Sequence, residues 1–327
     1  MAIYLSDSDV RSVIEMEDVL AVVEQAFRES ATGQAINLAR RQLNIPNGTY
    51  RMMSGAVPSL GAMCTKVGRH KWITQKSVGR SHDTIVLYST DSGDLMAVIL
   101  SDAVGDYRTG AMGGVATKFM ARTDARTLGM LGSGRQARTQ LMAIRLVRPL
   151  ERVLVYSPNP EHRRRYCEEM STLLDLEVMP VKDPREAVEP ADIVVAATSA
   201  EDAVFDGHWL REGTHVITIR SSYRVDPALG KERREIDDLT VKRSDIIALD
   251  SREQALLQQS PEIMPIVAQE RVTELAQIVA GRRPGRTNDR EITLFHSSGV
   301  GLVDAAAAAK VYQRAEERGL GLELPWP

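Results

Sequence analysis

Apolar residues near the start of the chain recur with the spacing of an amphipathic helix. Between Ser8 and about Ala31 they return roughly every 3.6 residues, which places them on one face of a helix. Gly33 follows as a stop signal. The spacing therefore predicts a single helix over about residues 8–31.

Short apolar runs broken by glycine and proline follow between residues 35 and 100. Two of the connections carry strong turn sequences, Asn47-Gly48 and the Asp-Ser-Gly-Asp of residues 91–94. Short runs joined by such turns are typical of β-hairpins. This part predicts an antiparallel or mixed sheet, with strands near residues 42–45, 50–53, 62–67, 84–88 and 96–100.

From residue 126 the pattern changes to apolar strands that alternate with longer helical segments, after a helix expected over about 109–120. Such alternation indicates an α/β fold with a parallel, doubly wound sheet. An alanine-rich helix over about 301–318 closes the chain. The expected strands are 127–131, 153–157, 177–181, 193–197, 215–219 and 246–249, and the expected helices among them are 136–147, 161–174 and 184–188.

Composition and charge exclude several classes of protein. The 41 basic and 44 acidic residues give a net charge of −3, which argues against a protein built to hold a polyanion. The two cysteines offer neither a disulfide scaffold nor metal-ligand spacing, and the six histidines show no i, i+4 pair, so no metal is expected. Without an apolar stretch of membrane length or a signal-like N-terminus, the expectation is a soluble, cytoplasmic protein with no membrane or nucleic-acid partner.

The sharpest local feature is a glycine-rich turn, Gly-Ser-Gly-Arg-Gln-Ala over residues 132–137. It matches G-x-G-x-x-A between an expected strand and an expected helix. In such a turn Gly132 permits the tight bend, Gly134 lets the backbone approach a pyrophosphate, and Ala137 lets the helix pack close to the strand. The helix N-terminus adds N–H groups and a positive dipole end for phosphates. The turn predicts dinucleotide binding, with a turn that binds nothing as the alternative.

The end of the next strand bears on the choice between NAD(H) and NADP(H). A site selective for NAD usually carries an acid there, whereas this chain reads Ser-Pro-Asn over residues 157–159. Three arginines follow at 163–165, and a guanidinium can pair with a 2′-phosphate. The cofactor is therefore NADP(H) or NAD(H), with a slight preference for NADP(H), unless these arginines only form a solvated helix face.

Candidate chemistry outside this half rests on basic residues. Lys66 ends an apolar run of small residues, where an ammonium is costly to bury without a partner. Arg108 stands at a probable helix start, and Arg40 and Arg41 lie farther upstream. Arginine binds a carboxylate bidentately and lysine can donate a proton, so these groups suit a small carboxylate substrate. The alternative is that they are ordinary surface residues.

Several short segments match a known family in their order and spacing. They are the opening helix, Thr65-Lys66, the Arg-Thr-Gly-Ala of 108–111, the turn at 132–137, Ala187-Val188, the Ala-Asp-Ile-Val of 191–194, the Gly-Thr-His of 213–215, the Glu-Ile-Asp of 235–237, the Ser-Ser-Gly of 297–299 and Asp304. Over nearly its whole length the chain resembles the ornithine cyclodeaminase and mu-crystallin family.

The resemblance implies a discontinuous architecture and a class of reaction. Residues 1–121 and 297–327 would form an α+β substrate-binding and dimerisation domain, with a Rossmann domain, 122–296, inserted in it. It further implies a homodimer and a hydride exchange between a nicotinamide and the Cα of a small amino or imino acid.

The resemblance also implies roles for individual residues. Lys66, Arg108 and Arg40 would be the catalytic residues that hold the substrate carboxylate, with Lys66 able to transfer a proton, and either Arg40 or Arg41 would face the site. Further substrate contacts would come from Arg41, Met53, Arg220, Ser222, Ser298 and Gly299. Cofactor contacts would come from Thr109, Gly132, Ser133, Gly134, Arg135, Gln136, Ala137, Ser157, Asn159, Arg163, Ala197, Thr198 and Ser199.

One departure from the family pattern separates the possible activities. Cyclodeaminases carry a catalytic aspartate, in a Gly-x-Asp pattern, where this chain reads Arg-Ser-Ser over residues 220–222. A serine hydroxyl has no negative charge with which to stabilise an iminium or take a proton at neutral pH. The chain therefore resembles the ketimine reductase or amino-acid dehydrogenase branch, with an ammonia-eliminating cyclodeaminase and a non-enzymatic NADPH-binding protein as the alternatives. Arg220 would be a second grip on an acidic substrate group or a surface guanidinium.

Overall fold

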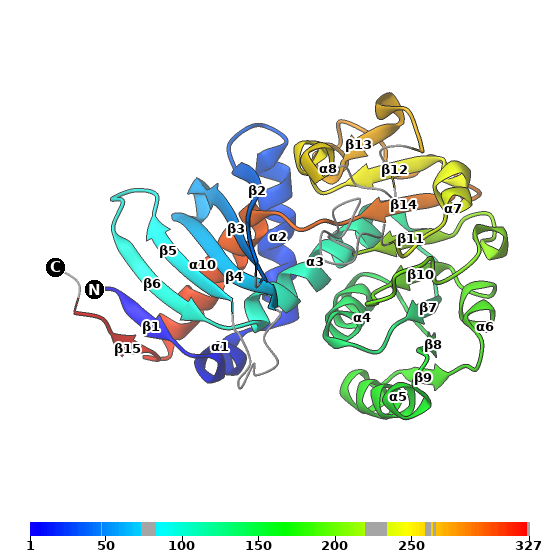
Figure 1. The fold of residues 1–327 in the computed structure, drawn as a ribbon, viewed down its shortest axis with the longest axis horizontal. Helices are drawn as coiled ribbons and strands as arrows, with labels where there is room; N and C mark the ends of the chain where they lie inside the picture. The colour runs from blue at the N-terminus through cyan, green and yellow to red at the C-terminus, as the bar shows by residue number, and fades with distance from the viewer. Residues whose placement is uncertain (47, 73–82, 220–233, 259–262, 264–265, 326–327) are drawn as a thin grey trace. The chain divides into compact units, whose positions relative to one another are not determined.

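The computed structural model describes residues 1–46, 48–72, 83–219, 234–258, 263 and 266–325. Contacts divide the chain into two compact units, residues 1–108 with 300–327, and residues 109–299. The chain thus leaves the first unit, builds the second and returns (Figure 1). Contacts place residues 109–121 and 297–299 in the second unit, whereas the sequence places them in the first domain. The first of these boundaries falls inside a helix, Ala103–Met120 (α3).

The first unit contains a mixed sheet with strand order β15-β1-β6-β5-β4-β3-β2. β1 runs parallel to β6, and the other neighbours are antiparallel, as the hairpin turns predict. Asn47, in the first predicted turn, lies outside the described residues, and its neighbour Gly48 pairs with Ile45. The strands are β1 (Ile3–Leu5), β2 (Ile36–Ile45), β3 (Gly48–Val57), β4 (Ala62–Trp72), β5 (Thr84–Ser89), β6 (Leu95–Leu100) and β15 (Leu322–Glu323).

The single helix predicted for residues 8–31 is wrong, because two helices stand there, α1 (Asp7–Val13) and α2 (Met16–Ser30). A capping box at Ser6 starts α1, and Ile14 and Glu15 between the helices adopt extended backbone conformations. The break lets Ile14 stay buried while the acidic first turn of α2 begins a new helix. Apolar spacing continues across the break, so periodicity alone did not reveal it.

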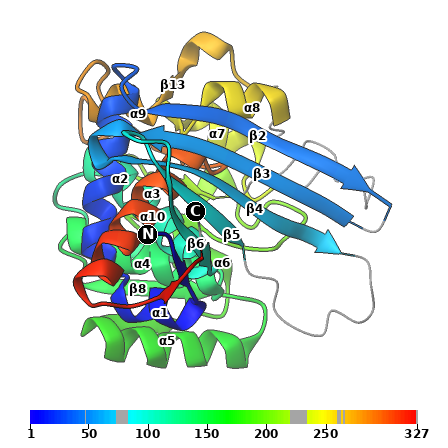
Figure 2. The ribbon, with the colours of Figure 1, turned by 90° about the vertical axis from the view of Figure 1, so that its left-hand side faces the viewer.

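Helices cover one face of this sheet. α10 (Gly301–Glu317) packs against β3 and β4 and against α2, and the short 3-10 helix η1 (Pro58–Leu60) joins β3 to β4 (Figure 2). The approach to β3 is close: a Cβ on Gly55 would lie 2.3 Å from the Leu302 nitrogen, and one on Gly301 would lie 2.4 Å from the Ser54 oxygen. Glycine at both positions therefore fixes the start of α10 on the sheet.

The second unit contains a sheet in which all the paired strands are parallel, in the order β13-β12-β14-β11-β10-β7-β8-β9. This confirms the predicted doubly wound fold. The direction of winding reverses between β7 and β10, and ligands bind at such switch points in open α/β sheets. The strands are β7 (Thr127–Leu131), β8 (Arg152–Tyr156), β9 (Glu177–Pro180), β10 (Ile193–Ala196), β11 (His215–Thr218), β12 (Ile246–Leu249), β13 (Val272–Glu274) and β14 (Thr293–His296).

Helices connect these strands, and the sequence predicts only the earlier ones. The sequence also missed β14, although it lies inside the sheet, because its four residues include only two apolar ones, Leu294 and Phe295. No helix in the described part of the chain combines the length and apolar character needed to cross a membrane. The helices are α4 (Arg135–Val147), α5 (Pro160–Leu174), α6 (Pro184–Val188), α7 (Asp238–Arg243), α8 (Arg252–Gln258) and α9 (Leu275–Val279), with 3-10 helices η2 (Gly207–Trp209) and η3 (Gln269–Arg271).

Candidate functional site

Lys66 lies on the helix-covered face of the first unit's sheet. Side chains along β4 alternate, with Ala62, Cys64 and Lys66 buried and the residues between them partly exposed. Lys66 pairs across the sheet with Met53 of β3 and Ile85 of β5, which are also buried. The lysine is only 6% exposed, so the register of the sheet forces its ammonium into the interior.

An aspartate on α10 meets this lysine and an arginine on α3. Asp304 is fully buried, and its Oδ1 lies 2.9 Å from Lys66 Nζ and 2.9 Å from Arg108 Nε. Asp83 adds a second carboxylate, with Oδ2 3.6 Å from Lys66 Nζ. Two residues that the sequence singled out, Lys66 and Arg108, are thus brought together by a third whose role it did not assign.

The start of α3 leaves room for this cluster. The hydroxyl of Ser101 accepts a hydrogen bond from the Ala103 N–H, where the helix begins. A Cβ on Gly105 would lie 3.7 Å from Lys66 Nζ, an ordinary van der Waals distance, so the start of the helix passes close beside the ammonium. Arg108 follows one turn later and reaches Asp304.

Cys64 stands two residues before Lys66 on the same face. Burial raises the pKa of its thiol, and the nearby Asp304 carboxylate raises the pKa further, against the opposite effects of Lys66 and Arg108. The thiol therefore stays neutral and is no nucleophile.

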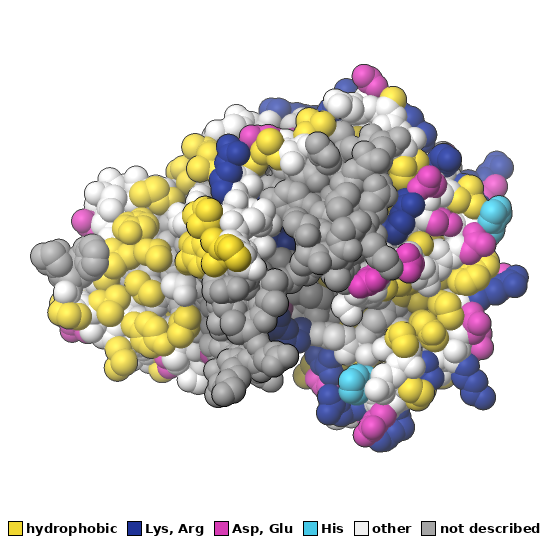
Figure 3. Space-filling view, viewed as in Figure 1, with side chains coloured by type: hydrophobic (Ala, Val, Ile, Leu, Met, Phe, Trp, Pro, Cys, Tyr) yellow, Lys and Arg dark blue, Asp and Glu magenta, His cyan; other side chains and the backbone are white. Residues whose placement is uncertain are grey.

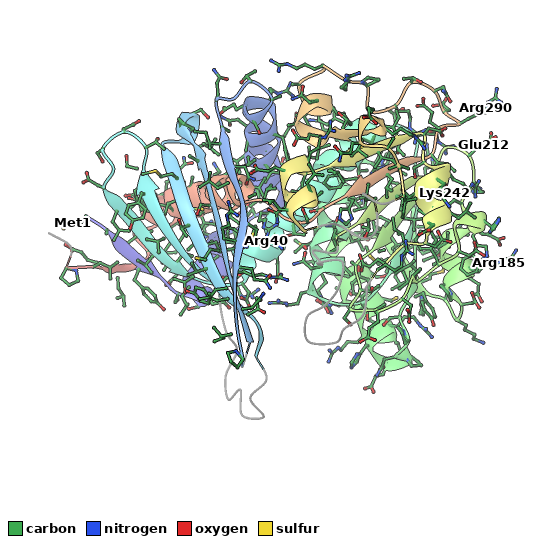
Figure 4. All side chains as sticks on the ribbon, turned by 45° about the horizontal axis from the view of Figure 1, so that its top comes forward. Met1, Arg40, Arg185, Glu212, Lys242 and Arg290 are labelled. Atoms are coloured by element: carbon green, nitrogen blue, oxygen red, sulfur yellow. The ribbon has the colours of Figure 1, made fainter. Side chains whose placement is uncertain are left out.

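The two upstream arginines lie differently on β2 (Arg40 is labelled in Figure 4). A register shift between Leu38 and Arg41 marks a bulge, and Arg40, inside it, is buried, at 6% exposed. Arg41 is exposed and pairs with Met52, whose side chain lies on the face opposite Lys66. The structure therefore does not bring Arg41 together with Lys66, and a role for Arg40 toward a substrate stays a prediction.

The glycine-rich turn of the second unit follows β7 at the switch point. Gly132 has a φ of +113°, and a Cβ there would lie 2.2 Å from the Ala197 oxygen, so the fold itself requires this glycine. Gly134 differs: its φ is −85°, and a Cβ there would meet nothing within 4 Å. Nothing in the described residues requires glycine at 134, whereas a pyrophosphate approaching the backbone would. This observation fits a bound dinucleotide.

The other residues of the turn connect it to neighbouring strands. Ser133 donates a hydrogen bond to the Ser157 hydroxyl at 3.0 Å, across the ends of β7 and β8. Ala137 is fully buried, and its carbonyl accepts from the Tyr166 hydroxyl. Arg135 is exposed and Gln136 is partly buried at the start of α4.

The end of β8 carries no acid, as its sequence shows. Asn159 caps α5 by accepting from two backbone N–H groups. Arg163 turns back to donate to the Ser157 carbonyl at 2.8 Å and lies over the Tyr156 ring. Arg164 instead pairs with Glu168 on the exposed side of α5. Of these two arginines, only Arg163 is placed beside the strand end.

A buried glutamate organises the loop after β10. Glu235 is fully buried and accepts hydrogen bonds from Thr198 and from Thr218 and Ile219 at the end of β11. Ala197, the first residue of this loop, donates to Leu131 at the end of β7. Ser199 is exposed in the same loop. Glu235 therefore holds the predicted cofactor loop 197–199 in place through Thr198. In the sequence, Glu235 stands out only within a segment that matches the family, with no role assigned to it.

A second buried acid, Asp250, holds the segment after β14. It accepts from the Ser298 and Gly299 backbone N–H groups at 2.8 and 2.6 Å and from the hydroxyls of Ser297 and Ser298. The backbone N–H groups of Ser298 and Gly299 are thus engaged in hydrogen bonds within the protein. Thr109 is buried on α3, where its carbonyl accepts from Gln140 of α4.

Two predicted residues, Arg220 and Ser222, lie outside the described residues. The acids that the sequence did not assign are Asp83, Asp304, Glu235 and Asp250. Asp304 could have been identified from the sequence, because a single acid in an otherwise apolar stretch needs a cationic partner. Within the described ranges no group of three or more His, Cys, Asp or Glu side chains could hold a metal ion.

A parallel sheet with a glycine-rich turn at its switch point defines a dinucleotide-binding fold of the Rossmann class. The chain belongs to the ornithine cyclodeaminase/mu-crystallin family, whose model matches residues 2–319.

Individual relatives are similar over their whole length. The Δ1-pyrroline-2-carboxylate reductase of Bacillus cereus is 31% identical over 98% of both chains. The structure of the Thermococcus litoralis enzyme of the same name, in complex with NADH and L-proline, matches with a TM-score of 0.89 and 36% identity, over 98% of this chain and 100% of that one. An archaeal alanine dehydrogenase dimer with bound NAD matches with a TM-score of 0.89 and 27% identity over 99% of each chain.

Proposed function

We propose that this protein is an NAD(P)(H)-dependent oxidoreductase that transfers hydride between the nicotinamide and the Cα of a small imino or amino acid. It would act as a ketimine reductase or, in reverse, as an amino-acid dehydrogenase. The observation that carries the proposal is the buried pair of cations, Lys66 and Arg108, which share one carboxylate oxygen of Asp304. Relatives named as imino-acid reductases and an amino-acid dehydrogenase, one with NADH and L-proline bound, support the substrate class.

The chain's own residues supply the substrate grip and the proton. Arg108 binds Asp304 through Nε, and its two terminal nitrogens have no partner in the described part of the chain. Such a pair fits a carboxylate bidentately. Lys66 donates a proton from Nζ to the imine nitrogen, and the neutral amine then regains a proton from water. Nicotinamide, when bound, supplies the hydride for the carbon or accepts it in the reverse direction.

The residues of the second unit would hold the dinucleotide. The open side of Gly134 admits the pyrophosphate, and the loop 197–199 lines the same strand ends. Structures of relatives contain NADH and NAD, which favours NAD(H). The slight preference for NADP(H) stays a prediction that depends on Arg163. The cytoplasmic location also stays a prediction, and cell fractionation would test it.

An assay of cofactor oxidation tests the reductase. Wild-type protein with NADH and Δ1-pyrroline-2-carboxylate, or pyruvate with ammonia, should consume NADH in step with amino-acid formation. Lys66→Met should lower kcat/KM by at least about 100-fold, because it removes both a charge and the proton donor. Lys310→Met, at a partly exposed position of α10 that pairs with Asp18, is the matched control and should leave the rate unchanged.

Three outcomes would contradict the proposal. An unchanged rate in Lys66→Met would show that the Lys66–Arg108 pair does not carry the reaction. Ammonia release from ornithine or lysine with catalytic NAD⁺ and no net NADH would identify a cyclodeaminase. Tight NADPH binding without turnover across imines and keto acids with amines would identify a binding protein.

The open face of the first unit's sheet supports a homodimer. Most side chains on this face are apolar and only partly buried, and Figure 3 shows apolar side chains spread over β5 and β6. An exposed apolar sheet face of this kind indicates a protein interface, and a second copy of the chain would bury it. The relative that is an alanine dehydrogenase dimer favours this assembly. The apolar residues of the face include Met52, Met63, Val67, Val86, Tyr88 and Val98.

Sedimentation equilibrium tests the assembly. The wild type should be a dimer, and Val86→Asp should be a monomer because the charge would be buried in the interface. Leu173→Asp, at an exposed apolar position of α5, is the control and should remain dimeric. A monomeric wild type at micromolar concentration would overturn the dimer.

A further inference from the structure

We propose that Asp304 is a positioning residue that fixes both Lys66 and Arg108 for the substrate. This inference rests on the proposed function, in which those two cations hold a carboxylate. The carboxylate of Asp304 does not touch the substrate in this scheme. It acts through the two groups that do.

The surroundings of Asp304 require cationic partners. Residues 301–309 of α10 are all buried, and Asp304 is the one charged residue among them. A carboxylate in such a place is stable only when it is paired and hydrogen-bonded. Its Oδ1 meets both cations at 2.9 Å, whereas Oδ2 has no hydrogen-bond partner among the described residues. Both contacts therefore converge on one atom and fix the cations relative to each other.

The sharing leaves donors on both cations. The Nε of Arg108 is engaged, so its terminal nitrogens form a fork for a carboxylate. An ammonium has three donors, and one from Lys66 goes to Asp304. The distance of 3.6 Å to Asp83 is an ion pair rather than a hydrogen bond, so Lys66 keeps donor capacity for a substrate.

The helix that carries Asp304 is held firmly. Gly55 and Gly301 allow backbone contact between β3 and α10, three residues before Asp304. The Cys64 thiol also donates to the Gly301 carbonyl at 3.9 Å. A carboxylate on so closely packed a backbone cannot follow its partners, so its partners must take their positions from it.

The charges that face Lys66 in the described residues come from several elements. Asp304 approaches from α10, Asp83 from the residue before β5 and Arg108 from α3, with the neutral Cys64 thiol alongside on β4. Loss of Asp304 would leave Arg108 nearby without its buried counter-charge. Neither cation would then be held by the carboxylate that fixes it relative to the other.

The experiment compares Asp304→Asn with Asp18→Asn. Asp18, on α2, pairs with Arg314 and Lys310 of α10 at partly exposed positions, so its variant controls for a weakened attachment of this helix. Competitive acetylation of Lys66 by acetic anhydride at pH 8, the chosen assay condition, followed by mass spectrometry, reports without any turnover whether the lysine is still held in its buried ion pair. The second readout is kcat and KM, determined separately, with NADH and Δ1-pyrroline-2-carboxylate.

In Asp304→Asn we expect Lys66 to be acetylated at least about tenfold faster at pH 8, because the lysine is no longer held by its buried carboxylate partner. We expect kcat/KM to fall about 100-fold, because both cations lose their fixed positions. Asp18→Asn should match the wild type in both readouts. If Asp304→Asn also matches the wild type in both, the proposal is wrong.

Two further outcomes keep the test decisive. If Asp304→Asn does not fold, Asp304→Glu retains the charge but moves it by one methylene, and acetylation of Lys66 as slow as in the wild type with a lowered kcat would support positioning. Wild-type kcat in Asp304→Glu would overturn it. If the wild type reduces no imine, the proposed function fails, while faster acetylation of Lys66 in Asp304→Asn still supports the positioning of Lys66 by Asp304.

Discussion

The Oε1 atom of Glu235 accepts hydrogen bonds from both the N–H and the hydroxyl of Thr198, at 2.6 and 2.8 Å. Its Oε2 atom accepts from the Thr218 hydroxyl and the Ile219 N–H at 2.9 and 3.3 Å. One buried carboxylate therefore ties the carboxyl ends of β10 and β11 together. The Ala197 carbonyl, at the start of the same loop, lies where a side chain on Gly132 would collide with it. The loop and the glycine-rich turn consequently form one packed edge.

We expect Glu235→Gln to weaken cofactor binding about tenfold, because an amide nitrogen would face the Ile219 N–H and leave buried donors unpaired. The free energy of unfolding should fall by about 1–3 kcal/mol for the same reason. NADH fluorescence titration and urea unfolding measure the two effects. The control is Asp238→Asn, three residues farther on, whose exposed side chain pairs only with Arg234 in the described residues. An unchanged NADH affinity would show that Glu235 supports the fold alone.

Substitutions at the two glycines of the turn should affect different properties, cofactor binding at Gly134 and stability at Gly132. Gly134→Val should leave stability nearly unchanged, since its φ is ordinary and its added atoms start in open space, but NADH affinity should fall by at least about 100-fold. Gly132→Val should lower the melting temperature, because its φ is positive and the Ala197 oxygen blocks a Cβ. Thermal unfolding and NADH titration of both variants distinguish the cases. Normal NADH binding in Gly134→Val would mean that no dinucleotide approaches this turn.

Arg163 should determine the kcat/KM of the enzyme for NADPH. It lies at the end of β8 beside Ser157, where a 2′-phosphate would carry its charge. Arg163→Ala should lower kcat/KM for NADPH about tenfold or more and change that for NADH little, because only the phosphate loses its partner. Arg164→Ala, one position along the same helix, removes a surface pair with Glu168 and should change neither value. Equal losses with both cofactors would assign Arg163 to the fold of the strand end.

The sequence predicts the parts of this fold that repeat locally. Strands of the second unit are short continuous apolar runs, so the parallel sheet follows from the alternation alone, and β7 lies at 127–131 as predicted. β14 is missed because Thr293 and His296 are polar yet buried, and only the neighbouring strands make them so. The break after Val13 is missed because apolar spacing passes through it.

The candidate site shows the same limit. Lys66 stands out in sequence because it is a cation in an apolar strand, but its partner Asp304 lies 238 positions away on another element. No local pattern pairs two such residues. The β2 bulge, which buries Arg40 and turns Arg41 to the other face, likewise depends on the pairing with β3.

His215 should make stability depend on pH near neutrality. It is fully buried in β11, with Nδ1 2.8 Å from the Thr293 hydroxyl, and burial lowers its pKa well below the ordinary 6.5, with Arg286 and Arg148 adding to the effect. The native protein therefore holds His215 neutral where the unfolded chain binds a proton. The free energy of unfolding is highest at pH values above the pKa of His215 in the unfolded chain. It falls as the pH drops below that pKa, by up to about 1.4 kcal/mol per pH unit. Urea unfolding between pH 5.5 and 8, the chosen assay range, should show this slope in the wild type and a shallower one in His215→Asn. His208→Asn, at an exposed histidine, should keep the wild-type slope. An equal slope in His215→Asn would mean that other groups bind the proton.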